Sequence, residues 1–289
     1  MGYRAIGFRP RRYHNPGVMS IGDGKWMLEN SMQVVRIVLL VLLMLAPRTS
    51  AALAPLTLTY DLYSAGLPVL ILEFQLNETE NSYRIDGLIH STGVADFFMR
   101  YLLRTQSEGT NGAEGLHPNL YTSDSHSRVR QRSARLQFRA DGRILTSLAP
   151  PEGPSQTSPT EQQIRGSFDP LAGILQAGNI VARLGNCATR MPIFDGRRRY
   201  DLVFSDDGIE HIPRSDDYAY AGDARRCTID MIKIAGFSTE SDSYGEKVDR
   251  AVVWLAAPYP DAPLLPVRAE FIGALGPTKV WLVAVRGGQ

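Results

Sequence analysis

The sequence is poor in the residues on which hydrolytic and metal-dependent enzymes rely. It has two cysteines and five histidines among 289 residues, and no two histidines have the H-x-x-x-H or H-E-x-x-H spacing of a metallohydrolase. No serine lies in a G-x-S-x-G turn, the element that exposes the nucleophile of many hydrolases. We therefore expect no metal, no cofactor and no catalytic residue. A non-enzymatic protein fits the sequence better than an unrecognised hydrolase.

The chain also lacks an apolar run long enough to cross a bilayer, which takes about 20 residues. Its longest run, Val34–Ala46, is shorter, contains one arginine, and is followed by small residues. This pattern is typical of a secretory signal, here with cleavage near Ala51 or Ala52. Residues 1–51 are therefore predicted to be a signal peptide, and their unusual length predicts a start-site extension. An uncleaved N-terminal anchor is the alternative.

The chain has no large excess of positive or of negative side chains. Without residues 1–51, the chain has 24 Lys and Arg against 28 Asp and Glu, a formal charge of −4. Non-specific nucleic-acid binding needs a basic surface, and export removes the protein from nucleic acid. We expect no nucleic-acid partner, and no integral membrane span once the signal has been removed.

Both cysteines, Cys187 and Cys227, lie in the part predicted to be exported. Two cysteines in an oxidising compartment most often form a disulfide, which would stabilise the fold by about 3–4 kcal/mol in the chain-entropy model. Two buried free thiols are the alternative. A zinc site is disfavoured because only His211 lies between them, and structural zinc needs four close ligands.

What the sequence does have is the pattern of one mainly β (α+β) domain over residues 52–289. Apolar and polar residues alternate in Leu56–Tyr63, as in a strand with one buried face. Asp-Gly pairs at 141–142, 195–196 and 207–208 favour hairpin turns, since glycine tolerates positive φ. We expect one curved antiparallel sheet or half-barrel of about eleven strands, with two short helices packed on its concave side.

The spacing of apolar residues predicts the first helix over Val94–Leu103. A second helix is predicted after Asp169, with Pro170 at its first position and Gly185 at its end. Residues 149–167 contain too few apolar side chains to pack, and a long mobile loop is expected there.

Two stretches are rich in arginine. Arg128, Arg130 and Arg132 share strand parity and would project from one face, where they could contact anionic lipid headgroups or an acidic partner. The favoured interpretation is that their stems cover the sheet while the guanidinium groups stay in water. In FDGRRRYDLVF, Arg198 shares a face with Tyr200, so among these three arginines it is predicted to meet a buried acid or a ligand headgroup.

Several short blocks together resemble the exported bacterial family called domain of unknown function 3108. The blocks are YDLYSAGL (60–67), FDPLAGIL (168–175), FDGRRRYDL (194–202), YAGDARRC (220–227), AGF (235–237), WLA (254–256) and PVRAEF (266–271). The resemblance covers most of the chain from Tyr60 onwards. Its first block departs slightly from the family, since Ala65-Gly66 replaces an expected Gly-Gly turn. It implies a periplasmic protein with a fold similar to the half-barrel of the Lol lipoprotein carriers. Those carriers hold acyl chains between sheet and helices. The family has no established activity, so no catalytic residues are carried over.

The leading functional hypothesis is a periplasmic protein that binds or carries a lipid or another hydrophobic ligand in a half-barrel cavity. A lipid or a lipid-modified protein would be its partner, and a structural or protein-interaction role in envelope assembly is the alternative. The aromatic face of the first predicted helix could line such a cavity, although aromatic stripes are more often plain core. The candidate ligand-binding residues are Phe97, Phe98, Tyr101, Arg198 and Trp254.

Overall fold

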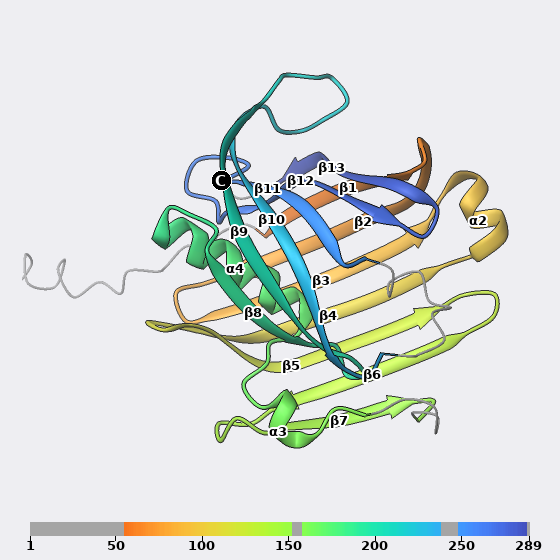
Figure 1. Ribbon diagram of the computed structural model, residues 1–289, viewed down its shortest axis with the longest axis vertical. Coiled ribbons are helices and arrows are strands. Elements are labelled where there is room, and N and C mark those ends of the chain that lie inside the picture. Colours follow the sequence, from red (N-terminus) through yellow and green to blue (C-terminus); the bar gives the residue numbers. More distant parts are fainter. Residues whose placement is uncertain (1–54, 152–157, 238–247, 288–289) are drawn as a thin grey trace, which may run out of the picture. The chain divides into compact units, whose positions relative to one another are not determined.

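The computed structural model describes residues 55–151, 158–237 and 248–287, so the predicted signal peptide lies outside the described residues. Within them, thirteen strands form one sheet in the order β7-β6-β5-β4-β3-β2-β1-β13-β12-β11-β10-β9-β8 (Figure 1). The strands are β1 (Leu56–Ser64), β2 (Leu67–Glu78), β3 (Ser82–Ser91), β4 (Leu102–Gly112), β5 (Gly115–His126), β6 (Gln131–Phe138), β7 (Ile144–Ala149), β8 (Thr189–Phe194), β9 (Arg199–Ile212), β10 (Gly222–Ala235), β11 (Arg250–Ala256), β12 (Leu265–Gly273) and β13 (Gly276–Arg286). The helices are α2 (Gly93–Met99), α3 (Glu161–Ile164) and α4 (Pro170–Leu184).

Every neighbouring pair of strands in this sheet is antiparallel, which confirms the predicted mainly β architecture. There are thirteen strands rather than about eleven. The sequence signal is weak in β4 and β5, whose Ser, Thr, Asn and Gly residues interrupt the apolar alternation. The pairing of β1 with β13 joins the two ends of the described chain in the middle of the sheet.

Helix α4 confirms the second predicted helix. The Asp169 carboxylate accepts hydrogen bonds from the backbone N–H groups of Leu171 and Ala172, both at 3.0 Å, and Gly185 ends the helix at φ 69°. The helix packs against β8 and β12 and also against β4 and β5, so it fills the concave side between the two halves of the sheet. A Cβ on Gly178 would lie 2.1 Å from the carbonyl oxygen of Leu264, which leaves no space at this contact.

The first predicted helix is shorter and lies elsewhere than expected. It ends at Met99, because Arg100 adopts a left-handed conformation with φ 45° and the chain continues into β4. None of the residues of α2 is buried, and the helix lies at the ends of β2 and β3 (Figure 1). The prediction that both helices pack on the concave side is therefore wrong for α2. Residue spacing identifies an apolar helix face but not whether another element covers it.

The predicted 149–167 loop contains a helical turn. Residues 152–157 lie outside the described residues, but α3 begins after Thr160, whose side chain and Gln163 form a reciprocal capping box. Ile164 is buried and packs with Phe194 and neighbouring residues of one core cluster. Arg165 Nη1 also donates to the Asp141 carbonyl at 2.5 Å, so apolar and polar contacts together dock this segment.

The Asp207-Gly208 pair does not form a hairpin turn, because it lies within the continuous strand β9. The pairing of β9 with β10 shifts register between Arg225 and Cys227, and Gly208 has φ 88°. A glycine with positive φ is typical of a β-bulge as well as of a hairpin turn. An Asp-Gly pair can therefore occur in either, and here it lies in a bulge.

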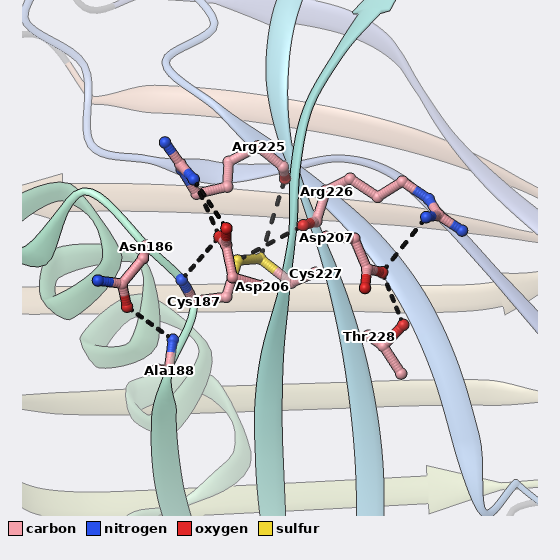
Figure 2. The surroundings of a disulfide bond; sticks show 9 residues. All are labelled: Asn186, Cys187, Ala188, Asp206, Asp207, Arg225, Arg226, Cys227 and Thr228. Carbon is pink, nitrogen blue, oxygen red and sulfur yellow. Dashed lines mark hydrogen bonds and ion pairs between the residues drawn. A yellow bond between two sulfur atoms is a disulfide. The ribbon is translucent and has the colours of Figure 1, made fainter.

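The predicted disulfide joins Cys187 to Cys227, with 5.9 Å between the Cα atoms (Figure 2). Cys187 follows α4, and Cys227 lies in β10, so the bond ties the start of the edge strand β8 to a strand two positions away. Asp206 supports the site: its Oδ1 accepts hydrogen bonds from the Cys187 backbone N–H at 3.0 Å and from Arg225 at 2.9 Å. The bond from Arg225 lowers the pKa of the Asp206 carboxyl.

The outer side of β8 is covered by the chain itself. Phe168 forms a parallel bridge with Ile193; its N–H donates to the Pro192 carbonyl and its own carbonyl accepts from the Phe194 N–H, both at 2.8 Å. The segment that leads into α4 therefore pairs with the edge strand of the sheet. No helix in the described part of the chain is both long and apolar enough to cross a bilayer.

Candidate functional site

The turns at one end of the sheet form a surface on which many apolar side chains are exposed. The strand ends are linked by pairing: Gly273 pairs with Gly276, Ser64 with both Thr278 and Leu67, Leu70 with Ser91, and Leu102 with both His90 and His126. The β12–β13 turn, the β1–β2 turn, α2 and the β5–β6 turn therefore lie at the same end, on the right in Figure 1. This end spans eight adjacent strands, about 34 Å along the sheet at the usual strand spacing.

Apolar side chains are exposed on all four of these connections. Phe97 and Phe98 are 71% and 66% exposed, and Val129 is 93% exposed. Each member of the set is at least half exposed, and we call the set the apolar rim: Leu67, Val94, Phe97, Phe98, Val129, Ile272 and Leu275. Scattered apolar residues are ordinary on a protein surface, but a contiguous set marks an interaction site.

Backbone hydrogen bonds hold the four connections together. The Arg128 N–H donates to the Met99 carbonyl at 3.1 Å, which fixes the β5–β6 turn to the end of α2. The Ala65 N–H donates to the Pro277 carbonyl at 2.9 Å, which fixes the β1–β2 turn to the β12–β13 turn. The N–H of Thr92, at the start of α2, donates to the Val69 carbonyl of β2 at 3.0 Å, which links these two pairs. The rim is therefore one surface rather than four independent loops.

The rim also carries excess positive charge. Its four connections contain Arg100, Arg128 and Arg130, all exposed, and a single acidic residue, Asp96. The Asp96 carboxylate accepts a hydrogen bond from the Ser91 hydroxyl at 2.6 Å, which anchors α2 to β3. The Arg128 guanidinium carbon lies 5.8 Å from the centre of the Phe97 ring, within cation–π range.

A hollow of about 310 Å³ adjoins the rim at the ends of β11, β12 and β13. It is open to solvent, and Ile272 belongs both to it and to the rim. The surface that lines it is mostly apolar. The lining residues are Arg250, Ala251, Val252, Glu270, Phe271, Ile272, Pro277, Thr278 and Lys279. This volume is at the lower limit for small-molecule pockets. A second open hollow, of about 500 Å³, lies at the β6–β7 turn.

Three of the five predicted ligand-binding residues lie together. Phe97 and Phe98 make an edge-to-face pair, with ring centres 5.2 Å apart, on the exposed helix α2. Tyr101 follows them and is half-buried. Burial raises the pKa of the Tyr101 hydroxyl, and the positive charge of Arg198 opposes this shift. Arg198 is therefore close enough to Tyr101 for the two side chains to interact electrostatically.

Arg198 does not have the buried acidic partner that was expected of it. Its Nε lies 3.8 Å from the half-buried Asp195 carboxylate, and that carboxylate mainly accepts backbone N–H groups of the hairpin turn. Arg199, on the opposite face, has that partner instead: its Nη1 donates to Asp201 at 2.5 Å, and both side chains are buried. The prediction of a buried acidic partner failed because it assumed that the apolar face of β9 alone would be covered. Helix α3 also covers the other face, where Arg199 Nε donates to the Gln163 carbonyl at 2.9 Å.

The arginines of this hairpin hold two distant parts of the chain together. Arg197 donates to the carbonyls of Pro150, at 2.8 Å, and Ala149, at the end of the edge strand β7. Gly196 packs against β6 and β7, since a Cβ there would lie 2.9 Å from the Ala134 side chain. The hairpin after β8 therefore contacts the opposite edge of the sheet through arginine–carbonyl bonds.

Trp254 lies apart from the other predicted residues, in β11. It is 3% exposed, and its cross-strand neighbours Arg226 and Arg268 place their guanidinium carbons 5.7 and 4.2 Å from its ring centre. A ligand would reach this ring only after the arginines moved.

Sequence reasoning missed most of the rim. Leu67, Ile272 and Leu275 lie in or beside strand turns, where one exposed apolar residue carries no signal by itself. Val129 stands between Arg128 and Arg130, whose predicted role as a solvated stripe concealed it. Only the strand pairing shows that these turns meet at one end.

The buried Asp169 carboxylate has a structural role as the cap of α4, whereas the buried Ser167 Oγ and Trp254 Nε1 have no hydrogen-bond partner in the part of the chain that the structure describes. Burial outweighs the hydrogen bonds from Ala172, Ser107 and Leu171, and raises the pKa of the Asp169 carboxyl to about 6. Ser107 Oγ donates to this carboxylate at 2.8 Å, which joins the start of α4 to β4. Within the described residues, no three His, Cys, Asp or Glu side chains are grouped so as to hold a metal ion.

Comparisons with known proteins agree with this architecture. The chain is similar in structure to a β-barrel-like protein of domain of unknown function DUF1849 from Brucella abortus, with a TM-score of 0.52 and 12% sequence identity. The alignment covers 82% of this chain and 99% of that chain, and at this identity it shows the fold alone. No curated protein matches the sequence. A match to the family described as "Protein of unknown function (DUF3108)" extends over residues 59–283, and the chain therefore belongs to that family.

Proposed function

We propose that this protein is an exported, non-enzymatic protein that binds lipid or another hydrophobic partner, and that it does so through the apolar rim. The observation that carries the proposal is the exposure of seven apolar side chains on turns that hydrogen bonds join into one surface. Fully burying one such side chain is worth about 1.5–3 kcal/mol, so leaving seven in water is costly unless a partner covers them.

The rim supports this function better than an enclosed cavity does. Helix α4 occupies the concave side of the sheet, and close contacts at Gly173 and Gly178 leave no room for a ligand beside them. The hollow beside Ile272, in contrast, is open and continuous with the rim, so an acyl chain could lie there without moving the helix.

The test compares lipid binding by the wild type and by two matched variants. The protein is recovered under gentle conditions and analysed by native mass spectrometry for co-purifying lipid, and uptake of a fluorescent fatty acid is titrated. Phe97→Ser/Phe98→Ser should weaken uptake about 30-fold or more, since two large side chains no longer contribute to burial. The control Leu184→Ser/Ile209→Ser removes two exposed apolar side chains outside the rim and should bind as the wild type does. A clean apo mass with no fatty-acid uptake would refute lipid binding and favour a protein partner in envelope assembly.

A further inference from the structure

We infer that the rim docks on the surface of a bilayer that contains anionic phospholipid, with Phe97, Phe98 and Val129 inserted and the neighbouring arginines on the phosphates. This inference rests on the proposed function and adds the kind of partner: an assembled, negatively charged lipid surface rather than a single extracted molecule.

The first argument is the distribution of charge. The chain without residues 1–51 has a formal charge of −4, yet the four connections of the rim carry three arginines and one aspartate. An acidic protein with one basic end is oriented by a negative surface, and that end approaches first. The carboxylate of this aspartate, Asp96, already accepts a hydrogen bond from the Ser91 hydroxyl.

The second argument is that charged and apolar groups alternate at short range on the rim. Val129 lies between Arg128 and Arg130 at the tip of a turn and is almost fully exposed. Arg128 also lies over the Phe97 ring. Arginine stems can lie along apolar surface while their guanidinium groups reach phosphate, so insertion of the rings and contact with headgroups occur at the same depth.

The third argument is the absence of competing partners within the described residues. No acidic group of residues 55–151, 158–237 or 248–287 forms an ion pair with Arg100, Arg128 or Arg130. Some arginines elsewhere on the sheet are paired, such as Arg84 with Asp86 and Glu108. The guanidinium groups of the rim are thus available to an external anion.

The extent of the rim favours a lipid surface over a single lipid molecule. It extends over eight strand ends, whereas the adjoining hollow holds only about 310 Å³. A protein that extracted one whole phospholipid would need a pocket of a size that neither surface hollow provides, but a bilayer can contact all four connections at once.

The experiment measures co-sedimentation with vesicles of phosphatidylcholine alone and of equal parts phosphatidylcholine and phosphatidylglycerol. All proteins are compared in the same processed form, verified by intact mass, because residues 1–51 contain an apolar segment of their own. We expect at least tenfold tighter binding to the anionic vesicles, and a loss of that preference as salt is raised from about 50 to 500 mM.

Arg100→Gln/Arg128→Gln/Arg130→Gln should weaken binding to anionic vesicles about 100-fold, from a contribution of about fivefold for each arginine near such a surface. The matched control neutralises three exposed arginines outside the rim, Arg139, Arg183 and Arg214, and should change binding less than threefold. Phe97→Ser/Phe98→Ser should weaken binding to both vesicle types.

Equal binding to the two vesicle types, or equal effects of the two arginine triples, would overturn the inference. Uptake of the monomeric fatty acid without vesicle binding would overturn it as well, while leaving the proposed function intact. Failure to bind either form of lipid would overturn this inference and also the lipid-binding part of the proposed function.

Discussion

The disulfide between Cys187 and Cys227 gives the most quantitative prediction. The bond closes a loop of 40 residues that contains β8 and β9. Cross-linking a loop of this length removes denatured-state entropy worth about 4 kcal/mol at 25 °C in the chain-entropy model. Both cysteines are fully buried, so truncating them also removes some packing. We expect the double variant Cys187→Ala/Cys227→Ala to lose about 4 kcal/mol of unfolding free energy or slightly more.

The assay is urea unfolding followed by circular dichroism and tryptophan fluorescence, with and without reductant. With a denaturant slope of about 2–3 kcal/mol per M, reduction of the wild type should lower the midpoint by roughly 1.3–2 M. Reductant should not move the midpoint of the double variant, which controls for effects unrelated to the bond. A shift below about 0.3 M on reduction would refute the loop-closure argument, and thiol labelling of the oxidised native protein would refute the bond itself.

Two further predictions concern buried charges. Burial raises the pKa of the Asp169 carboxyl to about 6 in the folded protein, above its value in the unfolded chain. Because the native state binds this proton more tightly, the free energy of unfolding should fall by about 2 kcal/mol as pH rises from 4 to 6. Asp169→Asn keeps a helix cap but should lack this slope in pH-dependent urea titrations, and identical slopes would contradict the assignment. Arg199→Met should cost about 3 kcal/mol, because the buried Asp201 loses one of its two arginines. The double variant Arg199→Met/Asp201→Leu should recover part of this loss, and strictly additive losses would show that the two side chains do not interact.

The strands and the second helix could be predicted because their signals are local. Alternation in Leu56–Ser64 follows directly from one buried face, and Asp169, Pro170 and Gly185 mark the limits of α4 by their capping chemistry. The disulfide followed from compartment and cysteine count rather than from geometry. Each of these inferences needs only neighbouring residues or composition.

The errors arise where a distant element decides the outcome. The pattern in Val94–Leu103 predicts an apolar face, but only the sheet topology shows that nothing in the described chain covers it. Which of two adjacent arginines is buried at the β8–β9 hairpin depends on the position of α3, 36 residues earlier. The rim itself joins turns separated by up to about 200 residues, and no local pattern can reveal that.

The strand at one edge of the sheet has a consequence for assembly. Phe168 forms hydrogen bonds with backbone groups on the outer side of β8, and a proline lies within that strand. The disulfide also links the residues just before β8 to β10. Such an edge cannot easily accept a strand from a second copy, nor can β8 be donated to one. We therefore expect any self-association of this protein to use faces or strand ends and not to extend the sheet through β8. Under oxidising conditions, strand exchange through β8 should therefore be disfavoured.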